Sequence, residues 1–195
     1  MWCSISGRSK LLIYSTVSES HIGAFSPEAS STDISNRESY KGPKGIDKVT
    51  WNPSGQLLAI AACNETIAIL NYVTWKPILE LRCEPVIGET DYLGKVHREC
   101  VIGTRDGNVN FGQGEKHTME EVTDRPVNIP IAANARSDGL SIATVDIFEF
   151  SPCGRYLALR HQVYSSTMWI WDIAEDSVDH LLLQRPVSGA STIHR

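Results

Sequence analysis

The stretch WNPSGQLLAI at 51–60 decides the fold, because the chain repeats it as FSPCGRYLAL at 150–159. Both copies run aromatic, polar, proline, small, glycine, polar, and then apolar around a Leu-Ala pair. The proline restricts φ, and the glycine, Gly55 in one copy and Gly154 in the other, adopts a positive φ without steric cost. Each copy therefore predicts two strands joined by a tight turn.

Each copy belongs to a longer unit of four short strands. In the first unit, IDKVTWN (46–52) alternates apolar and polar residues, the pattern of a strand with one buried face. QLLAIAAC (56–63) is apolar without alternation, which predicts a strand covered on both faces. Two further strands are expected over TIAILNY and PILELR. The second unit repeats this order with VDIFEF, RYLALR, TMWIWDI and VDHLLLQ, so both units predict antiparallel meanders.

A third, partial copy opens the chain, since 10–25 aligns without a gap on 66–81. A meander of about 40 residues cannot bury both of its faces alone, so its repetition indicates a stack of such units. We expect an all-β fold, part of a β-propeller with about two and a half four-stranded blades and a long inter-blade insertion. The expected organisation is the last strands of an incomplete blade (1–27), a polar loop (28–45), a blade (46–85), the insertion (86–143), a blade (144–185) and the start of a truncated next blade (186–195).

The insertion is the longest departure from the repeat. Its first half, 86–121, is rich in glycine and charge, and we expect a partly disordered surface excursion. Its second half contains VTDRPVNIP, and we expect an edge strand near 122–132 that closes the preceding blade, because Pro126 and Pro130 suit a sheet edge. A closed propeller needs more blades than this sequence supplies, so we expect either a truncated copy, which we favour, or a chain that assembles with further blades.

The second unit resembles a named class of propellers. MWIWDI at 168–173, with Trp171 and Asp172, resembles the Trp-Asp dipeptide of the WD-repeat propellers, and the turns with Gly55 and Gly154 resemble those between their first and second strands. The Gly-His pair that usually starts a WD repeat is absent, and Asn71 and Ser15 stand where the aspartate would be. The side-chain hydrogen-bond network common in such blades is therefore expected to be incomplete.

A narrower resemblance concerns KLLIYS, the whole of 45–81, VTDRPVNIP and the closing FSPCGRYLALR…MWIWDI, in that order. Together they resemble the WD-repeat proteins of the centrosome and spindle pole, and ILNYVTWK (69–76) is the most specific part. This resemblance implies a scaffold in microtubule minus-end anchoring, with a coiled-coil partner and, in fungi, a minus-end kinesin. It also implies a location in the cytoplasm, at the cytoskeleton of the centrosome or spindle pole body.

Composition and motifs exclude several other functions. The net charge of −5 disfavours nucleic acid and anionic membranes as partners. The five cysteines form no CxxC pair, which predicts reduced thiols and no metal site. The chain has no GxSxG elbow, no phosphate-binding GK[ST] loop and no calcium loop, so we expect no enzymatic activity and no cofactor.

Two questions stay open from sequence. Trp75, in the turn VTWK, is either an exposed partner anchor or a staple that holds the turn onto its own blade. The scaffold role also has alternatives with the same fold: an adaptor subunit of a ubiquitin ligase or another multiprotein complex, or a propeller that gates a hydrolase domain elsewhere in a longer protein.

Overall fold

The computed structural model describes residues 2–6, 10–27, 45–63, 65–88, 94–102, 116–132, 145–173 and 180–184. These ranges contain strands and the short 3-10 helix η3 (Gln162–Tyr164). The strands are β1 (Trp2–Ser6), β2 (Lys10–Tyr14), β3 (His21–Phe25), β4 (Ile46–Trp51), β5 (Leu57–Ala62), β6 (Thr66–Asn71), β7 (Pro77–Arg82), β8 (Val86–Ile87), β9 (Gly94–Ile102), β10 (Lys116–Glu121), β11 (Val127–Asn128), β12 (Val145–Phe150), β13 (Tyr156–His161), β14 (Thr167–Asp172) and β15 (His180–Gln184).

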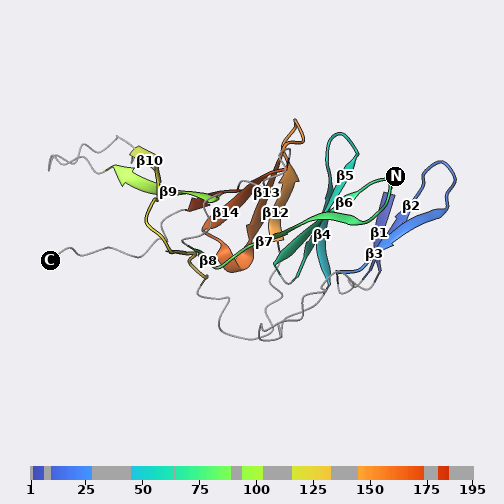
Figure 1. The fold of residues 1–195 in the computed structure, drawn as a ribbon, viewed down its shortest axis with the longest axis horizontal. Helices are drawn as coiled ribbons and strands as arrows, with labels where there is room; N and C mark the ends of the chain where they lie inside the picture. The colour runs from blue at the N-terminus through green and yellow to red at the C-terminus, as the bar shows by residue number, and fades with distance from the viewer. Residues whose placement is uncertain are drawn as a thin grey trace, which may run out of the picture.

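Three antiparallel units stand side by side along the molecule (Figure 1). The N-terminal blade has the order β1-β2-β3, the central blade β4-β5-β6-β7, and the C-terminal blade β12-β13-β14-β15. The first strands of the central and C-terminal blades, β4 and β12, lie next to each other. The all-β, partial-propeller fold predicted from the repeat is therefore confirmed.

The two copies of the opening phrase form the same turn. The Gly55 N–H donates to the Asn52 carbonyl at 2.8 Å, and the Gly154 N–H donates to the Ser151 carbonyl at 2.8 Å. The two glycines have φ of +72° and +76°, a conformation that glycine adopts without the clash a Cβ would cause. The tight turns predicted from Gly55 and Gly154 are therefore confirmed.

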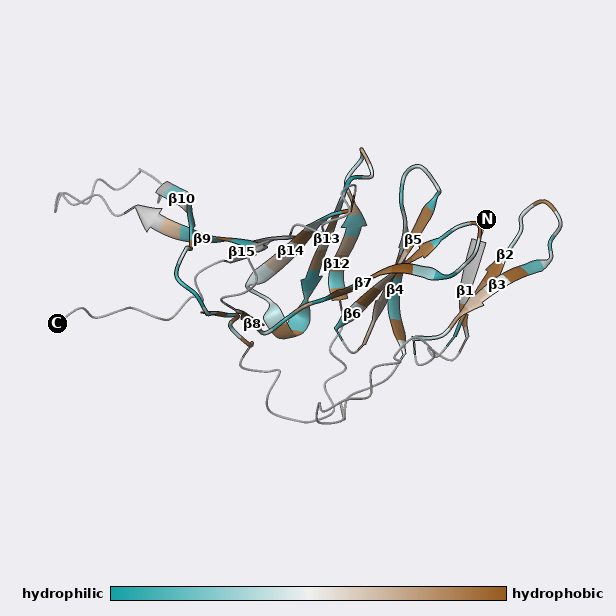
Figure 2. Ribbon diagram, in the orientation of Figure 1, coloured by the Kyte–Doolittle hydropathy of each residue, from teal (hydrophilic) through white to brown (hydrophobic). Residues whose placement is uncertain are grey.

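The central blade is buried on both faces, because its second and third strands place apolar residues on alternate sides. Leu58, Ile60 and Leu70 pack with Leu11 and Ile13 of the N-terminal blade. The opposite face packs against the C-terminal blade through Ala59, Ala61, Ile67 and Ile69. Figure 2 shows the hydrophobic residues concentrated in these blade strands. Complete burial of one Leu or Ile side chain stabilises the folded state by about 1.5–3 kcal/mol. Packing against the neighbouring blades is therefore the main source of stability for a blade.

The N-terminus holds three strands of a blade. The expectation was the last strands of an incomplete blade at 1–27, and there β1 pairs with β2 along all five of its residues, Trp2–Ser6. The sheet alignment makes β1 the second strand of its blade, because β2 corresponds to the third strand of the repeat.

Within the insertion, the described residues form strands that the sequence pattern did not predict. β9 and β10 form an antiparallel hairpin, and β9 joins the C-terminal blade by pairing parallel with β15. Within 122–132, the short strand β11 pairs with β8, not with β7 of the preceding blade. Residues 103–115, like the loop 28–44 and the segment 185–195, lie outside the described residues.

Candidate protein-interaction surface

Two hairpin turns, one on each of the first two blades, are built alike. In the turn at 15–20 the Ser15 N–H donates to the Ser20 carbonyl at 2.9 Å, and in the turn at 71–76 the Asn71 N–H donates to the Lys76 carbonyl at 3.1 Å. The side chain of the first residue caps each turn. Ser15 Oγ accepts from the backbone N–H groups of Val17 and Ser18, both at 3.2 Å.

Asn71 caps its turn in the same way. Its Oδ1 accepts from the N–H of Val73 at 2.8 Å and of Thr74 at 3.3 Å. Side chains of Ser and Asn favour such turns because they satisfy nearby backbone N–H groups. Ser15 and Asn71 stand where the WD aspartate would be, so these two blades use that position to shape the turn.

The two turns expose apolar residues where polar ones are usual. Val17 is 95% exposed, and Val73, at the same position 56 residues later, is 65% exposed. Tyr72 beside it is also exposed. We call Val17, Tyr72 and Val73 the tip surface. Because turn residues are normally Gly, Pro, Asn, Asp or Ser, the valine repeated at one turn position is the candidate for a contact surface.

Trp75 lies beneath the tip surface and joins two blades. Its ring meets Trp51 of its own blade edge-to-face, with ring centroids 6.1 Å apart. On the other side, a Cβ built on Gly23 of β3 would lie only 2.6 Å from the Trp75 ring, so only glycine allows this approach. This half-buried position supports the staple interpretation and extends it to the neighbouring blade. The role of Trp75 as a partner anchor stays a prediction.

Trp75 also has an unusual backbone conformation. Its φ is +55°, and the equivalent residue Glu19 in the first turn has φ +51°. A bulky residue in the left-handed region is strained, at a cost of about 1–3 kcal/mol. The contacts of the indole with Gly23 and Trp51 offset this cost. The ring therefore fixes the turn relative to both blades.

The WD-type pair of the C-terminal blade has divided roles. Trp171 is buried in the core between the central and C-terminal blades. Asp172 accepts a hydrogen bond from Arg155 Nε at 2.7 Å, and the Arg155 guanidinium lies 5.3 Å from the centre of the Tyr156 ring. The pair thus joins the third strand to the turn that contains Gly154.

Polar contacts lock the central blade to the C-terminal blade. Asn52 Nδ2 donates to the Gly154 carbonyl at 2.7 Å, so the two repeated turns are bonded to each other. At the other end of the first strands, Lys48 Nζ donates to the Asp146 carbonyl at 2.8 Å, and Asp47 accepts from the Val145 N–H. These contacts were not expected from the sequence, although Asp47 and Asp146 occupy equivalent positions, 99 residues apart, and both lie at β-bulges.

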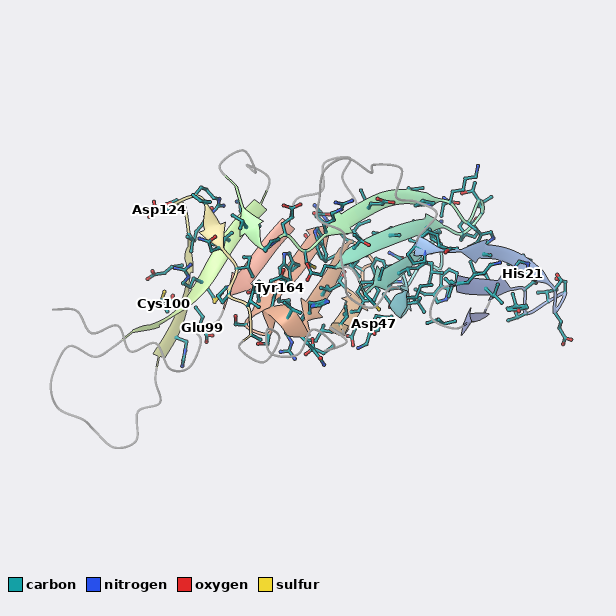
Figure 3. The ribbon with its side chains drawn as sticks, turned by 90° about the horizontal axis from the view of Figure 1, so that it is seen from below. His21, Asp47, Glu99, Cys100, Asp124 and Tyr164 are labelled. Atoms are coloured by element: carbon teal, nitrogen blue, oxygen red, sulfur yellow. The ribbon has the colours of Figure 1, made fainter. Side chains whose placement is uncertain are left out.

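A buried polar cluster lies deeper in the same junction. Tyr164 donates to Glu65 Oε2 at 3.3 Å, and Figure 3 shows Tyr164 in the middle of the molecule, among the strands of the blades. Burial raises the pKa of Glu65 and of Tyr164, and burial together with the Glu65 charge raises the pKa of Cys83. Burial lowers the pKa of His161, against the attraction of two nearby carboxylates.

Three buried polar atoms in this region, His161 Nε2, Thr167 Oγ1 and Trp169 Nε1, have no hydrogen-bond partner among the described residues. All three side chains come from β13 and β14 and are almost fully buried. This agrees with an incomplete side-chain network in a blade without the Gly-His pair. A buried donor left unpaired costs about 1–3 kcal/mol.

The described residues offer little reactive chemistry. No group of three or more His, Cys, Asp or Glu side chains among them is placed to hold a metal ion. The four cysteines whose side chains are described, Cys63, Cys83, Cys100 and Cys153, are free thiols. Within the described ranges, no helix has the length and apolar character needed to cross a bilayer.

Comparison with known proteins finds one informative relative. The chain is 31% identical over 150 residues to the mouse (Mus musculus) protein named WD repeat-containing protein WRAP73, a match that covers 69% of this chain. The chain spans 31% of the length of that relative. No protein-family model matches the sequence. The repeated blades, their turns and this relative define the chain as part of a WD-repeat β-propeller.

Solved structures similar to the chain have low identity and low structural scores. One is the Cps50 (Swd1) beta-propeller domain of Myceliophteria thermophila, with 11% identity, a TM-score of 0.35, and coverage of 90% of this chain and 49% of that one. Another is Hsv2 of Kluyvelomyces marxianus, with 9% identity, a TM-score of 0.31, and coverage of 88% and 42%. A chain of the Mitotic Checkpoint Complex has 12% identity, a TM-score of 0.33, and coverage of 87% and 43%.

Proposed function

We propose that this chain is part of a non-enzymatic scaffold that binds other proteins through the tip surface. The observation that carries this proposal is the exposure of Val17 and Val73 at the same turn position on two neighbouring blades. Both turns are held by internal hydrogen bonds, and the Trp75 ring fixes one of them between the blades. A surface that is already rigid loses little conformational entropy when a partner binds.

The proposed setting is the centrosome or spindle pole, with a role in microtubule minus-end anchoring and spindle organisation. The resemblance of ILNYVTWK supports this setting, because that phrase contains Tyr72 and Val73 of the tip surface. A coiled-coil anchoring protein suits the surface chemically, since an amphipathic helix presents apolar side chains that can bury exposed valines and a tyrosine. A minus-end kinesin is the proposed further partner in fungi.

The test is a double substitution, Val17→Asp with Val73→Asp, in the full-length protein that contains this chain. We expect capture of the coiled-coil partner and location at the pole to fall on the order of tenfold, while the melting temperature stays unchanged, because both side chains are exposed. Ile78→Asp is the matched control, since Ile78 is also exposed but lies on β7, outside the tip surface.

Unchanged capture and location in the double variant would contradict the proposal. Co-purification dominated by ubiquitin-ligase subunits, without pole components, would instead select the adaptor alternative.

A further inference from the structure

The β9–β10 hairpin extends the sheet of the C-terminal blade beyond its fourth strand. The described parts of the other two blades have no such extension. β15 would be the outermost strand of a four-stranded blade, but β9 pairs with it in parallel from Gly94 to Arg98. Among the described residues, β9 beyond Arg98 pairs only with β10. Figure 3 shows Glu99 and Cys100 on this hairpin, at the end of the molecule opposite to His21. The sheet thus ends in β10, away from the tip surface.

The outer edge of β10 is unpaired within the described part of the chain. Such an edge presents a row of backbone N–H and C=O groups that can pair with another strand. Thr118 is half-exposed and Met119 is 45% exposed, so the middle of the strand is not covered. The part of the hairpin beyond β15 is also a two-stranded ribbon, which is marginally stable in water without a further strand.

The charges of β10 are ordered along its length. The strand reads Lys-His-Thr-Met-Glu-Glu, so its basic residues come first and its acidic residues last. In the register that aligns the two copies of Thr118, an antiparallel copy of the strand would set Lys116 of each strand opposite Glu120 of the other. A parallel copy would place like charges opposite each other, which is destabilising.

Charged residues on an edge commonly prevent pairing, and this is the competing explanation for β10. Guarding an edge requires charge but does not require that the two signs be separated along the strand. The order in β10 opposes parallel pairing and favours antiparallel pairing with itself. Glu120 and Glu121 are both exposed, which leaves them accessible to a second strand.

We propose that β10 pairs antiparallel with β10 of a second copy of this chain, so that two C-terminal blades form one continuous sheet. A two-fold axis perpendicular to the sheet keeps equivalent faces on the same side. The register that places Thr118 opposite Thr118 of the second copy sets Lys116 opposite Glu120 of the second copy. Facing threonines and opposite charges are both favourable cross-strand pairs.

Disulfide trapping tests this pairing. The exposed thiol Cys153 and the neighbouring thiol Cys100 are first removed as Cys153→Ser and Cys100→Ser, and Thr118→Cys is then introduced. We expect mild oxidation to give a covalent dimer through position 118. Val17→Cys in the same background is the matched control, because Val17 is 95% exposed and lies far from the hairpin, and we expect it to give no comparable dimer.

Charge reversal then distinguishes strand pairing from random collision. Adding Glu120→Lys should slow formation of the dimer on the order of tenfold, because like charges then lie opposite each other twice. Adding Lys116→Glu to that variant should restore the rate. Equal trapping at positions 17 and 118, or a rate that Glu120→Lys leaves unchanged, would overturn the proposal.

Hydrogen exchange of the unmodified chain gives an answer that does not depend on the variants folding. The outward amides of β10 should become more protected as protein concentration rises, while the turn amides at 15–20 should not. Exchange of β10 that is independent of concentration would show that its charges only guard the edge.

Discussion

The central and C-terminal blades have the same strand order, the same glycine turn and the same bulge, yet their second faces differ. In the central blade that face carries Ala59, Ala61, Ile67 and Ile69, all of which are almost fully buried against the C-terminal blade. The equivalent positions of the C-terminal blade are Ala158, Arg160, Met168 and Ile170, and all of them are only half-buried. The repeated unit therefore sets the backbone, while the neighbour sets the burial.

Arg160 shows how the chemistry follows the difference in burial. It stands where the central blade has Ala61, and it donates to Asp146 Oδ2 through Nε at 2.9 Å and Nη2 at 2.6 Å. This ion pair holds the pKa of Asp146 below its usual range, against the opposing effect of desolvation. Arg160 is 40% exposed at its side chain, so the pair contributes about 1 kcal/mol or less.

The largest expected effect comes from truncating equivalent core positions in the two blades. Ile69→Ala should lower the free energy of unfolding by about 2–5 kcal/mol, because Ile69 is fully buried and the cavity cannot collapse. Ile170→Ala, at the equivalent but half-buried position, should cost about half as much or less. Urea unfolding of the two variants measures the difference. Equal losses would mean that the two faces are equally covered.

The two turn glycines should differ next. Gly55→Ala adds only the strain of a positive φ, about 1–2 kcal/mol, because nothing lies within 4 Å of the added Cβ. Gly154→Ala adds that strain and also places its Cβ 2.9 Å from the Asn52 amide, which would weaken the bond between the blades. We expect Gly154→Ala to cost about 1 kcal/mol more than Gly55→Ala.

The comparison of the two glycines has its own control. In an Asn52→Ala background the Gly154→Ala and Gly55→Ala variants should become equal in thermal unfolding, since the obstructing amide is gone. A difference that survives in this background would contradict the assigned contact.

The smallest expected effects compare the two hairpin turns. Glu19→Gly should raise stability by about 0.5–1 kcal/mol, because it relieves a positive φ and removes no described packing. Trp75→Gly relieves the same strain but loses the contacts with Gly23 and Trp51, so it should lower stability by about 1–2 kcal/mol. Thermal unfolding gives both signs. A Trp75→Gly variant that is stabilised would remove the staple role.

Local features of the chain predicted much of the fold. The repeated phrase placed the two turns at Gly55 and Gly154, and the unbroken apolar run of 57–62 predicted a strand covered on both faces, which its burial confirms. These features are readable because turn chemistry and side-chain alternation act over a few residues.

Contacts between distant residues were not readable in the same way. The β9–β10 hairpin has only short apolar runs, and its place beside β15 depends on a strand edge that lies more than 70 residues away in sequence. The tip surface had a signal in the alignment of 10–25 with 66–81, which pairs Val17 with Val73, but exposure at a turn can be judged only in space.

By itself, the sequence determined that this protein is a series of small antiparallel sheets, because period and turn chemistry are local properties of a chain. Only the tertiary structure decided which sheet faces are buried, that Trp75 joins two blades, and that Asn52 bonds one repeated turn to the next. Those outcomes depend on which surfaces meet, and packing sets them between residues separated by about 50–100 positions.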